Sequence, residues 1–149
     1  MRKLKVLIIE DDDHKCSEIE LFLRETFPNV ILKYGKSYQS GIQEATREQY
    51  DLLLLDMSIP NFDINENEDG GSTLKNGGEL IIMELMDENI DFKCLVLTQY
   101  ETFNEETLDA IDIRLKENCG EKYLGCIRYS AWKDDWKELL KNAILNLKS

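Results

Sequence analysis

The chain has 149 residues, a formal net charge of −12, 42% hydrophobic residues and 32% charged residues. This length suits one domain with a buried core, so we expect a single domain over residues 1–149. The excess of acidic residues repels phosphate backbones, and direct binding to nucleic acid is therefore not expected.

The chain shows no apolar run long enough to span a bilayer, so we expect no membrane segment. The N-terminal stretch "MRKLKVLIIEDDD" is basic and then apolar, but acids end the apolar run early, which predicts a first strand rather than a signal peptide. The four cysteines form no CxxC pair. We interpret them as free thiols of a cytoplasmic protein.

Short apolar runs alternate with longer amphipathic segments, which predicts alternating strands and helices. In chain order we expect a strand at 5–10, a helix at 13–27, a strand at 30–34, a helix at 37–49, a strand at 51–56, a helix at 78–88, a strand at 92–98, a helix at 104–118, a strand at 123–129 and a last helix with an apolar face from Trp136 to Leu147. This alternation predicts an α/β three-layer sandwich, in which helices cover both faces of a parallel sheet. The unbroken leucines of 51–56 suit a strand that is covered on both faces.

The composition shifts at residues 61–78, which are polar, acidic and rich in glycine. This segment predicts a long loop, and a loop of this length in a compact domain often carries function. We interpret it as an acidic insertion, which is either a solvated loop or a docking loop for a partner.

Acidic side chains follow two of the predicted strands. Glu10, Asp11 and Asp12 end the first strand, Asp56 ends the third, and Thr98 ends the fourth. Ligands of open parallel sheets bind beyond the carboxyl ends of the strands, where the strand order reverses. If the first and third strands are neighbours, the carboxylates converge and need a cation, and Mg2+ suits such oxygen ligands. The alternative is that Glu10 to Asp12 only cap a helix and that Asp56 only starts a loop.

The segments "VLIIEDDD", "LLLLDMSIPNFD" and "LVLT" resemble the receiver domain of bacterial response regulators, the phospho-accepting part of two-component signalling. The resemblance covers nearly the whole chain. It implies a flavodoxin-like fold, with a five-stranded parallel sheet of order 2-1-3-4-5 flanked by five helices.

The resemblance also implies a role for each site residue. Asp56 is the expected phospho-acceptor, and Thr98 is expected to hydrogen-bond the phosphoryl group. Mg2+ is expected to bind directly to Asp11 and Asp56, to Glu10 mainly through water, and to the backbone carbonyl of Ser58. In this chemistry a carboxylate attacks phosphorus, and the metal offsets the repulsion between two anions.

The chain departs from the family pattern at the fifth strand. The family carries a lysine followed by a proline there, whereas this chain has Tyr129 and Ser130. Arg128 is one residue out of phase and is expected to face the other side of the strand. To replace the family lysine, Lys133 would have to reach back to the site from the start of the last helix. Cys126 occupies the position at which the family usually has an aromatic switch residue.

We therefore expect a stand-alone receiver that is not an enzyme in its own right. It would accept a phosphoryl group on Asp56 from a histidine kinase or phosphotransfer protein, with Mg2+. It would then bind another protein through its fourth helix, fifth strand and fifth helix. The alternatives are a receiver-like interaction module that does not depend on phosphorylation and a Mg2+-dependent hydrolase on the same fold.

Overall fold

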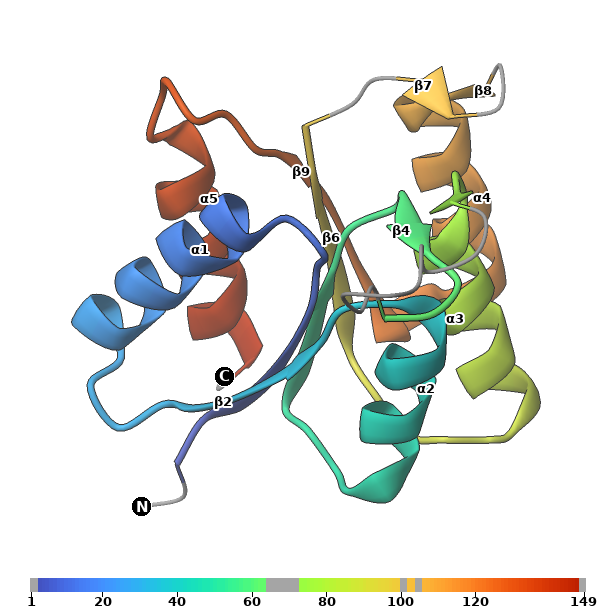
Figure 1. Ribbon diagram of the computed structural model, residues 1–149, viewed down its shortest axis with the longest axis horizontal. Helices are drawn as coiled ribbons and strands as arrows, with labels where there is room; N and C mark the ends of the chain where they lie inside the picture. Colours follow the sequence, from blue (N-terminus) through green and yellow to red (C-terminus); the bar gives the residue numbers. More distant parts are fainter. Residues whose placement is uncertain (1–2, 64–72, 100–101, 104–105, 148–149) are drawn as a thin grey trace.

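The computed structural model describes residues 3–63, 73–99, 102–103 and 106–147 (Figure 1). Its centre is a sheet of five parallel strands in the order β2-β1-β3-β6-β9. The strands are β1 (Lys5–Ile9), β2 (Ile31–Gly35), β3 (Leu52–Leu55), β6 (Cys94–Thr98) and β9 (Tyr123–Arg128). The sheet order implied by the receiver resemblance is confirmed.

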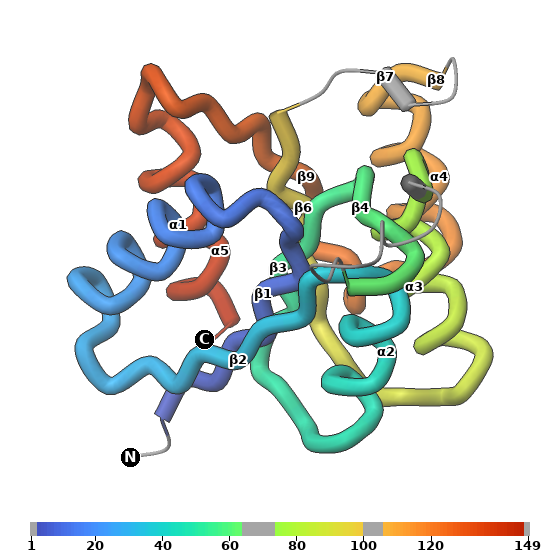
Figure 2. Tube along the Cα trace, viewed as in Figure 1, coloured from blue at the N-terminus to red at the C-terminus, as the bar shows by residue number. Residues whose placement is uncertain are grey.

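Five helices cover the two faces of this sheet, as the alternating sequence pattern predicts. They are α1 (Asp13–Thr26), α2 (Tyr38–Arg47), α3 (Gly77–Asp87), α4 (Leu108–Cys119) and α5 (Asp135–Leu147), and a short 3-10 turn, η1 (Gly120–Lys122), follows α4. Helices α1 and α5 lie on one face, and α2, α3 and α4 lie on the other (Figure 2).

Alternate residues of the central strands divide the core into two layers. Leu53 and Leu55 of β3 pack toward α2, α3 and α4, whereas Leu52 and Leu54 pack toward α1 and α5. All four leucines are buried, which confirms that this strand is covered on both faces. The described part of the chain holds no helix that is both long and apolar enough to cross a bilayer.

The connection between β3 and α3 contains a second, small sheet. β4 (Ile59–Pro60) pairs antiparallel with β5 (Thr73–Leu74), so the two ends of the acidic segment lie side by side. Residues 64–72 of the expected 61–78 loop lie outside the described residues. Within the expected loop, Thr73–Leu74 form β5, and α3 begins at Gly77.

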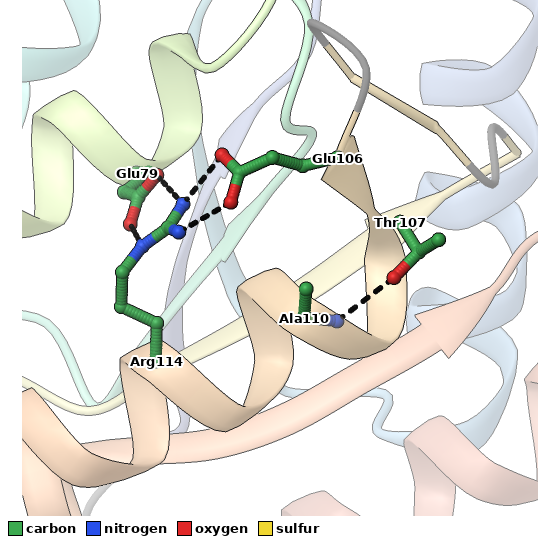
Figure 3. Close-up of polar contacts among 5 residues, drawn as sticks. All are labelled: Glu79, Glu106, Thr107, Ala110 and Arg114. Carbon is green, nitrogen blue, oxygen red and sulfur yellow. Dashed lines mark hydrogen bonds and ion pairs between the residues drawn. The ribbon is translucent and has the colours of Figure 1, made fainter.

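The prediction of a helix at 104–118 is wrong at its N-terminal end. β7 (Thr102–Phe103) and β8 (Glu106–Thr107) form a small antiparallel pair where the helix was expected to start. The Thr107 side chain accepts a hydrogen bond of 3.1 Å from the backbone N–H of Ala110 and so caps α4 (Figure 3). Glu106 and Thr107, which were expected in the first helical turn, belong instead to this pair.

An arginine ties this region to the neighbouring helix. The guanidinium of Arg114 on α4 donates 2.7 and 2.8 Å hydrogen bonds to both carboxylate oxygens of Glu79 on α3, and it also pairs with both oxygens of Glu106 (Figure 3). Such bidentate pairs fix orientation as well as distance. Arg114 thereby holds β8 and the start of α4 against α3.

Candidate functional site

The order of the strands places the acids that follow β1 beside the acid that follows β3. From β1 the chain passes to β2 on one side, and it later returns to β3 on the other side of β1. The strand order therefore reverses between β1 and β3, which is where ligands of such sheets bind. Glu10 follows β1 and Asp56 follows β3, and the Asp56 N–H donates a 3.1 Å hydrogen bond to the carbonyl oxygen of Ile9.

The structure brings three of the predicted site residues together. One carboxylate oxygen from each of Glu10, Asp11 and Asp56 lies within 4.8 Å of the others. Glu10 and Asp56 are buried, with 3% and 5% of their surface exposed, whereas Asp11 is exposed. The cluster thus has two fixed, buried carboxylates and one carboxylate at the surface.

Backbone contacts fix the carboxylate of Asp56. Its Oδ1 accepts a 2.7 Å hydrogen bond from the N–H of Met57, and the carbonyl oxygen of Met57 accepts a 2.9 Å bond from the N–H of Gly78. A Cβ on Gly78 would lie 2.4 Å from the carbonyl oxygen of Asp56, so only glycine allows α3 to begin this close to the loop. The first turn of α3 therefore positions Asp56.

The capping role that we considered for the acids after β1 belongs to Asp12. Its Oδ1 accepts a 3.1 Å hydrogen bond from the N–H of Lys15, at the N-terminus of α1. The N–H of Asp12 in turn donates a 3.1 Å bond to Oε2 of Glu10. Asp12 thus starts the helix and orients its buried neighbour.

The site contains a lysine that the sequence analysis did not include. Lys15 is 1% exposed, and its Nζ lies 2.6 Å from Oε1 of Glu10 and 3.4 Å from Oδ2 of Asp56. A signal for it was present in the sequence, because Lys15 lies four residues before Ile19 and eight before Leu23, on the buried face of α1. A lysine on an apolar helix face directly after an acidic cluster can reach back into that cluster.

Burial raises the pKa values of two carboxyl groups in this cluster, those of Glu10 and Asp11. The pKa of Glu10 lies above its usual value, because burial outweighs the lowering effect of Lys15, and the nearby Asp56 raises it further. The pKa of Asp11 is also raised, first by desolvation and then by Asp56 and Asp12. A cation bound there would stabilise the ionised form of these carboxylates.

The donor set fits a divalent metal ion. Three ionised carboxylates opposed by the single ammonium of Lys15 leave two uncompensated negative charges within a few ångströms. Carboxylate oxygens, with one exposed ligand that leaves room for water, are the environment that Mg2+ prefers. Asp11, Asp56 and Glu10 would hold such an ion.

The structure places the other predicted residues at strand ends and in the connections that follow them. Thr98 is buried at the end of β6, beside β3 and β9, and Ser58 lies in the partly exposed turn between Asp56 and β4. Arg128 and Lys133, the basic residues considered as replacements for the family lysine, have exposed side chains.

Comparison with solved structures identifies the fold of this chain. The chain has the fold of a response regulator receiver domain. Over 99% of its length it resembles the magnesium-bound receiver domain of the sensor histidine kinase PA1611 from Pseudomonas aeruginosa, of which it covers 100%, with a TM-score of 0.60 at 16% sequence identity.

Relatives by sequence are distant. The chain is 28% identical to the uncharacterized protein y4jR of Sinorhizobium fredii, over 97% of this chain and 99% of the relative. It is 27% identical to the Detocs response regulatory protein DtcB of Enterobacter cloacae, over 70% of this chain and 71% of the relative. No family model matches the chain.

Proposed function

We propose that the protein is a phospho-accepting receiver of a two-component phosphorelay, with Asp56 as the acceptor. The observation that supports this most is the gathering of Glu10, Asp11 and Asp56 at the point where the strand order reverses. A buried, backbone-oriented carboxylate beside two further acids is the arrangement that such an acceptor requires.

The proposed step forms one bond and breaks one. A carboxylate oxygen of Asp56 attacks the phosphorus of a phosphohistidine, and a new O–P bond forms. The P–N bond breaks, its electron pair stays on the imidazole nitrogen, and that nitrogen takes a proton from solvent. The donor would be a histidine kinase or a phosphotransfer protein of the cytoplasm.

The residues of the chain prepare this step. The N–H of Met57 holds Oδ1 of Asp56, and the burial of the carboxylate limits the directions from which phosphorus can approach. Mg2+, held by Asp11, Asp56 and Glu10 together with the carbonyl of Ser58, would offset the charge of the incoming phosphoryl group. Thr98 would donate a hydrogen bond to that group from the adjacent strand end.

Treatment with acetyl phosphate and Mg2+ tests the proposal. The carboxylate of Asp56 should displace acetate, and intact-protein mass spectrometry should show the gain of one phosphoryl group. The Asp56→Asn variant should show no gain. The Asp13→Asn variant removes an exposed acid outside the cluster and should be modified like the wild type. Modification of Asp56→Asn at the wild-type level would refute the assignment.

One observation favours a second candidate, a receiver-like interaction module that does not depend on phosphorylation. Lys15 already pairs with Glu10 and Asp56, so the buried acids have a cation without a metal ion. For this candidate, acetyl phosphate would leave Asp56 unmodified, and Mg2+ would bind no more tightly to the wild type than to Asp11→Asn.

A further inference from the structure

We propose that Lys15 is the cation that binds the phosphoryl group on Asp56, reaching the site from α1 rather than from the end of the fifth strand of the sheet. This inference rests on the proposed function. It names the residue that would recognise the phosphoryl group, which Tyr129 and Ser130 cannot do because neither carries a positive charge.

The geometry of the ammonium group supports this assignment. A lysine ammonium has three N–H donors. Lys15 directs one to Oε1 of Glu10 at 2.6 Å and one to the carbonyl oxygen of Leu97 at 2.6 Å. The remaining contact is the longer one, 3.4 Å to Oδ2 of Asp56, so one donor is available near the oxygen that can carry the phosphoryl group.

The residue that replaces the family lysine supports Lys15. The Nζ of Lys15 lies 5.4 Å from the centre of the Tyr129 ring, and this ring packs against Trp136 at 5.3 Å between centroids. An ammonium near an aromatic ring is stabilised by the electrons of the ring. Tyr129 is also hydrogen-bonded to β6 through its backbone, because its N–H donates to the carbonyl oxygen of Thr98 at 2.8 Å. The ring of Tyr129 thus stands where the family has a lysine, and it stabilises the ammonium of Lys15.

The other nearby basic residues are less suited to this role. Arg128 pairs with Thr98 in the sheet register, but its side chain is exposed, and Lys133 is exposed in the segment before α5. Lys15 is buried, and a buried cation interacts with an anion more strongly than an exposed one, because water screens it less.

The same ammonium connects the acceptor to β6. Leu97, whose carbonyl oxygen accepts from Lys15, immediately precedes Thr98. A phosphoryl group brings up to two further negative charges and three strong acceptor oxygens, which compete for the donors of Lys15. Phosphorylation would therefore weaken the bond between Lys15 and Leu97 and alter the strand end that carries Thr98.

Binding of beryllofluoride at saturating Mg2+ tests the inference, with fluorine NMR on the full chain as the readout. Lys15→Met keeps a similar length and removes the charge, and it should lower beryllofluoride affinity roughly ten- to a hundredfold, the loss of one charge-assisted hydrogen bond. Lys15→Arg retains the charge and should restore part of this affinity. The matched control is Lys133→Met, which removes an exposed lysine and should bind like the wild type.

The possible outcomes separate a failure of the role of Lys15 from a failure of the proposed function. If the wild type binds no beryllofluoride and takes no phosphoryl group, the proposed function fails and the inference fails with it. If the wild type binds and Lys15→Met binds equally well, only the role of Lys15 is refuted. If Lys15→Met does not fold, a crystal structure of the wild-type beryllofluoride complex decides the matter. Nζ within hydrogen-bond distance of a fluorine supports the inference, and Nζ bonded only to Glu10 and Leu97 overturns it.

Discussion

At the scale of one residue, the aromatic ring of Tyr129, directly after β9, should contribute to the stability of the fold. Tyr129 is 4% exposed and contacts both the ammonium of Lys15 and the ring of Trp136. We expect Tyr129→Leu to lower the free energy of unfolding by about 1–3 kcal/mol, because both ring interactions are lost. Urea denaturation followed by circular dichroism measures this change.

Tyr129→Phe is the matched control, because it removes only the hydroxyl. That hydroxyl is buried without a hydrogen-bond partner among the described residues, so its loss should leave the stability close to that of the wild type. Equal destabilisation by Phe and Leu would show that the hydroxyl, and not the ring, stabilises this region.

The sequence could locate the acids of the site, but for its lysine it indicates only a place on the buried face of α1 and not the partners of the ammonium. Glu10, Asp11 and Asp56 were predictable because strand ends are visible in the sequence, and parallel strands end on the same edge of a sheet. The contact of Lys15 with Leu97 joins residues 82 positions apart in the chain. It depends on how α1 packs against β6, which periodicity alone does not specify.

At the scale of elements, the start of α3 controls the position of the acceptor. A Cβ on Gly78 would meet the backbone of Asp56 at 2.4 Å and the Cα of Met57 at 3.1 Å, and backbone atoms cannot rotate away. We expect Gly78→Ala to lower the free energy of unfolding by about 1–3 kcal/mol, as overpacking does, and to slow the modification of Asp56 by acetyl phosphate. Urea denaturation and timed mass spectrometry measure the two effects.

Gly41→Ala in α2 is the comparison for this substitution. The three atoms nearest to its Cβ would be side-chain atoms of Ile9 and Ile81, at 3.1–3.2 Å, and these side chains can adjust. Alanine also favours helix over glycine by about 1 kcal/mol, which offsets the crowding. If the two variants lose equal stability and modify Asp56 at the same rate, the close approach at Gly78 has no special role.

The elements themselves were largely predictable, because their periodicity reflects burial on one or two faces. There were two exceptions: the β4–β5 pair, whose second strand lies within the expected loop, and the start of α4, where Glu106 and Thr107 suit either a first helical turn or a short strand pair. Arg114 on α4 binds Glu106 on β8 and Glu79 on α3, and these contacts favour the strand pair (Figure 3). Such a tertiary contact overrides local propensity and leaves little trace in the local sequence.

At the scale of the whole molecule, the net charge of −12 makes the folded state sensitive to all cations. Any salt screens the repulsion among the acids and stabilises the compact chain somewhat. A metal bound at the Glu10, Asp11 and Asp56 cluster would add a stabilisation that depends on its concentration and not on ionic strength. The two effects can therefore be separated.

We expect Mg2+ at about one hundred times its dissociation constant to stabilise the protein by about 2.7 kcal/mol, which corresponds to a rise in Tm of roughly 5–10 °C. Thermal unfolding in MgCl2 should be compared with NaCl at the same ionic strength. Asp11→Asn alters an exposed ligand without disturbing the buried pair, so this variant should keep the response to NaCl and lose the additional response to Mg2+. The same rise in both salts would mean that Mg2+ acts only by screening, and an additional response that persists in Asp11→Asn would place the metal elsewhere on this acidic surface.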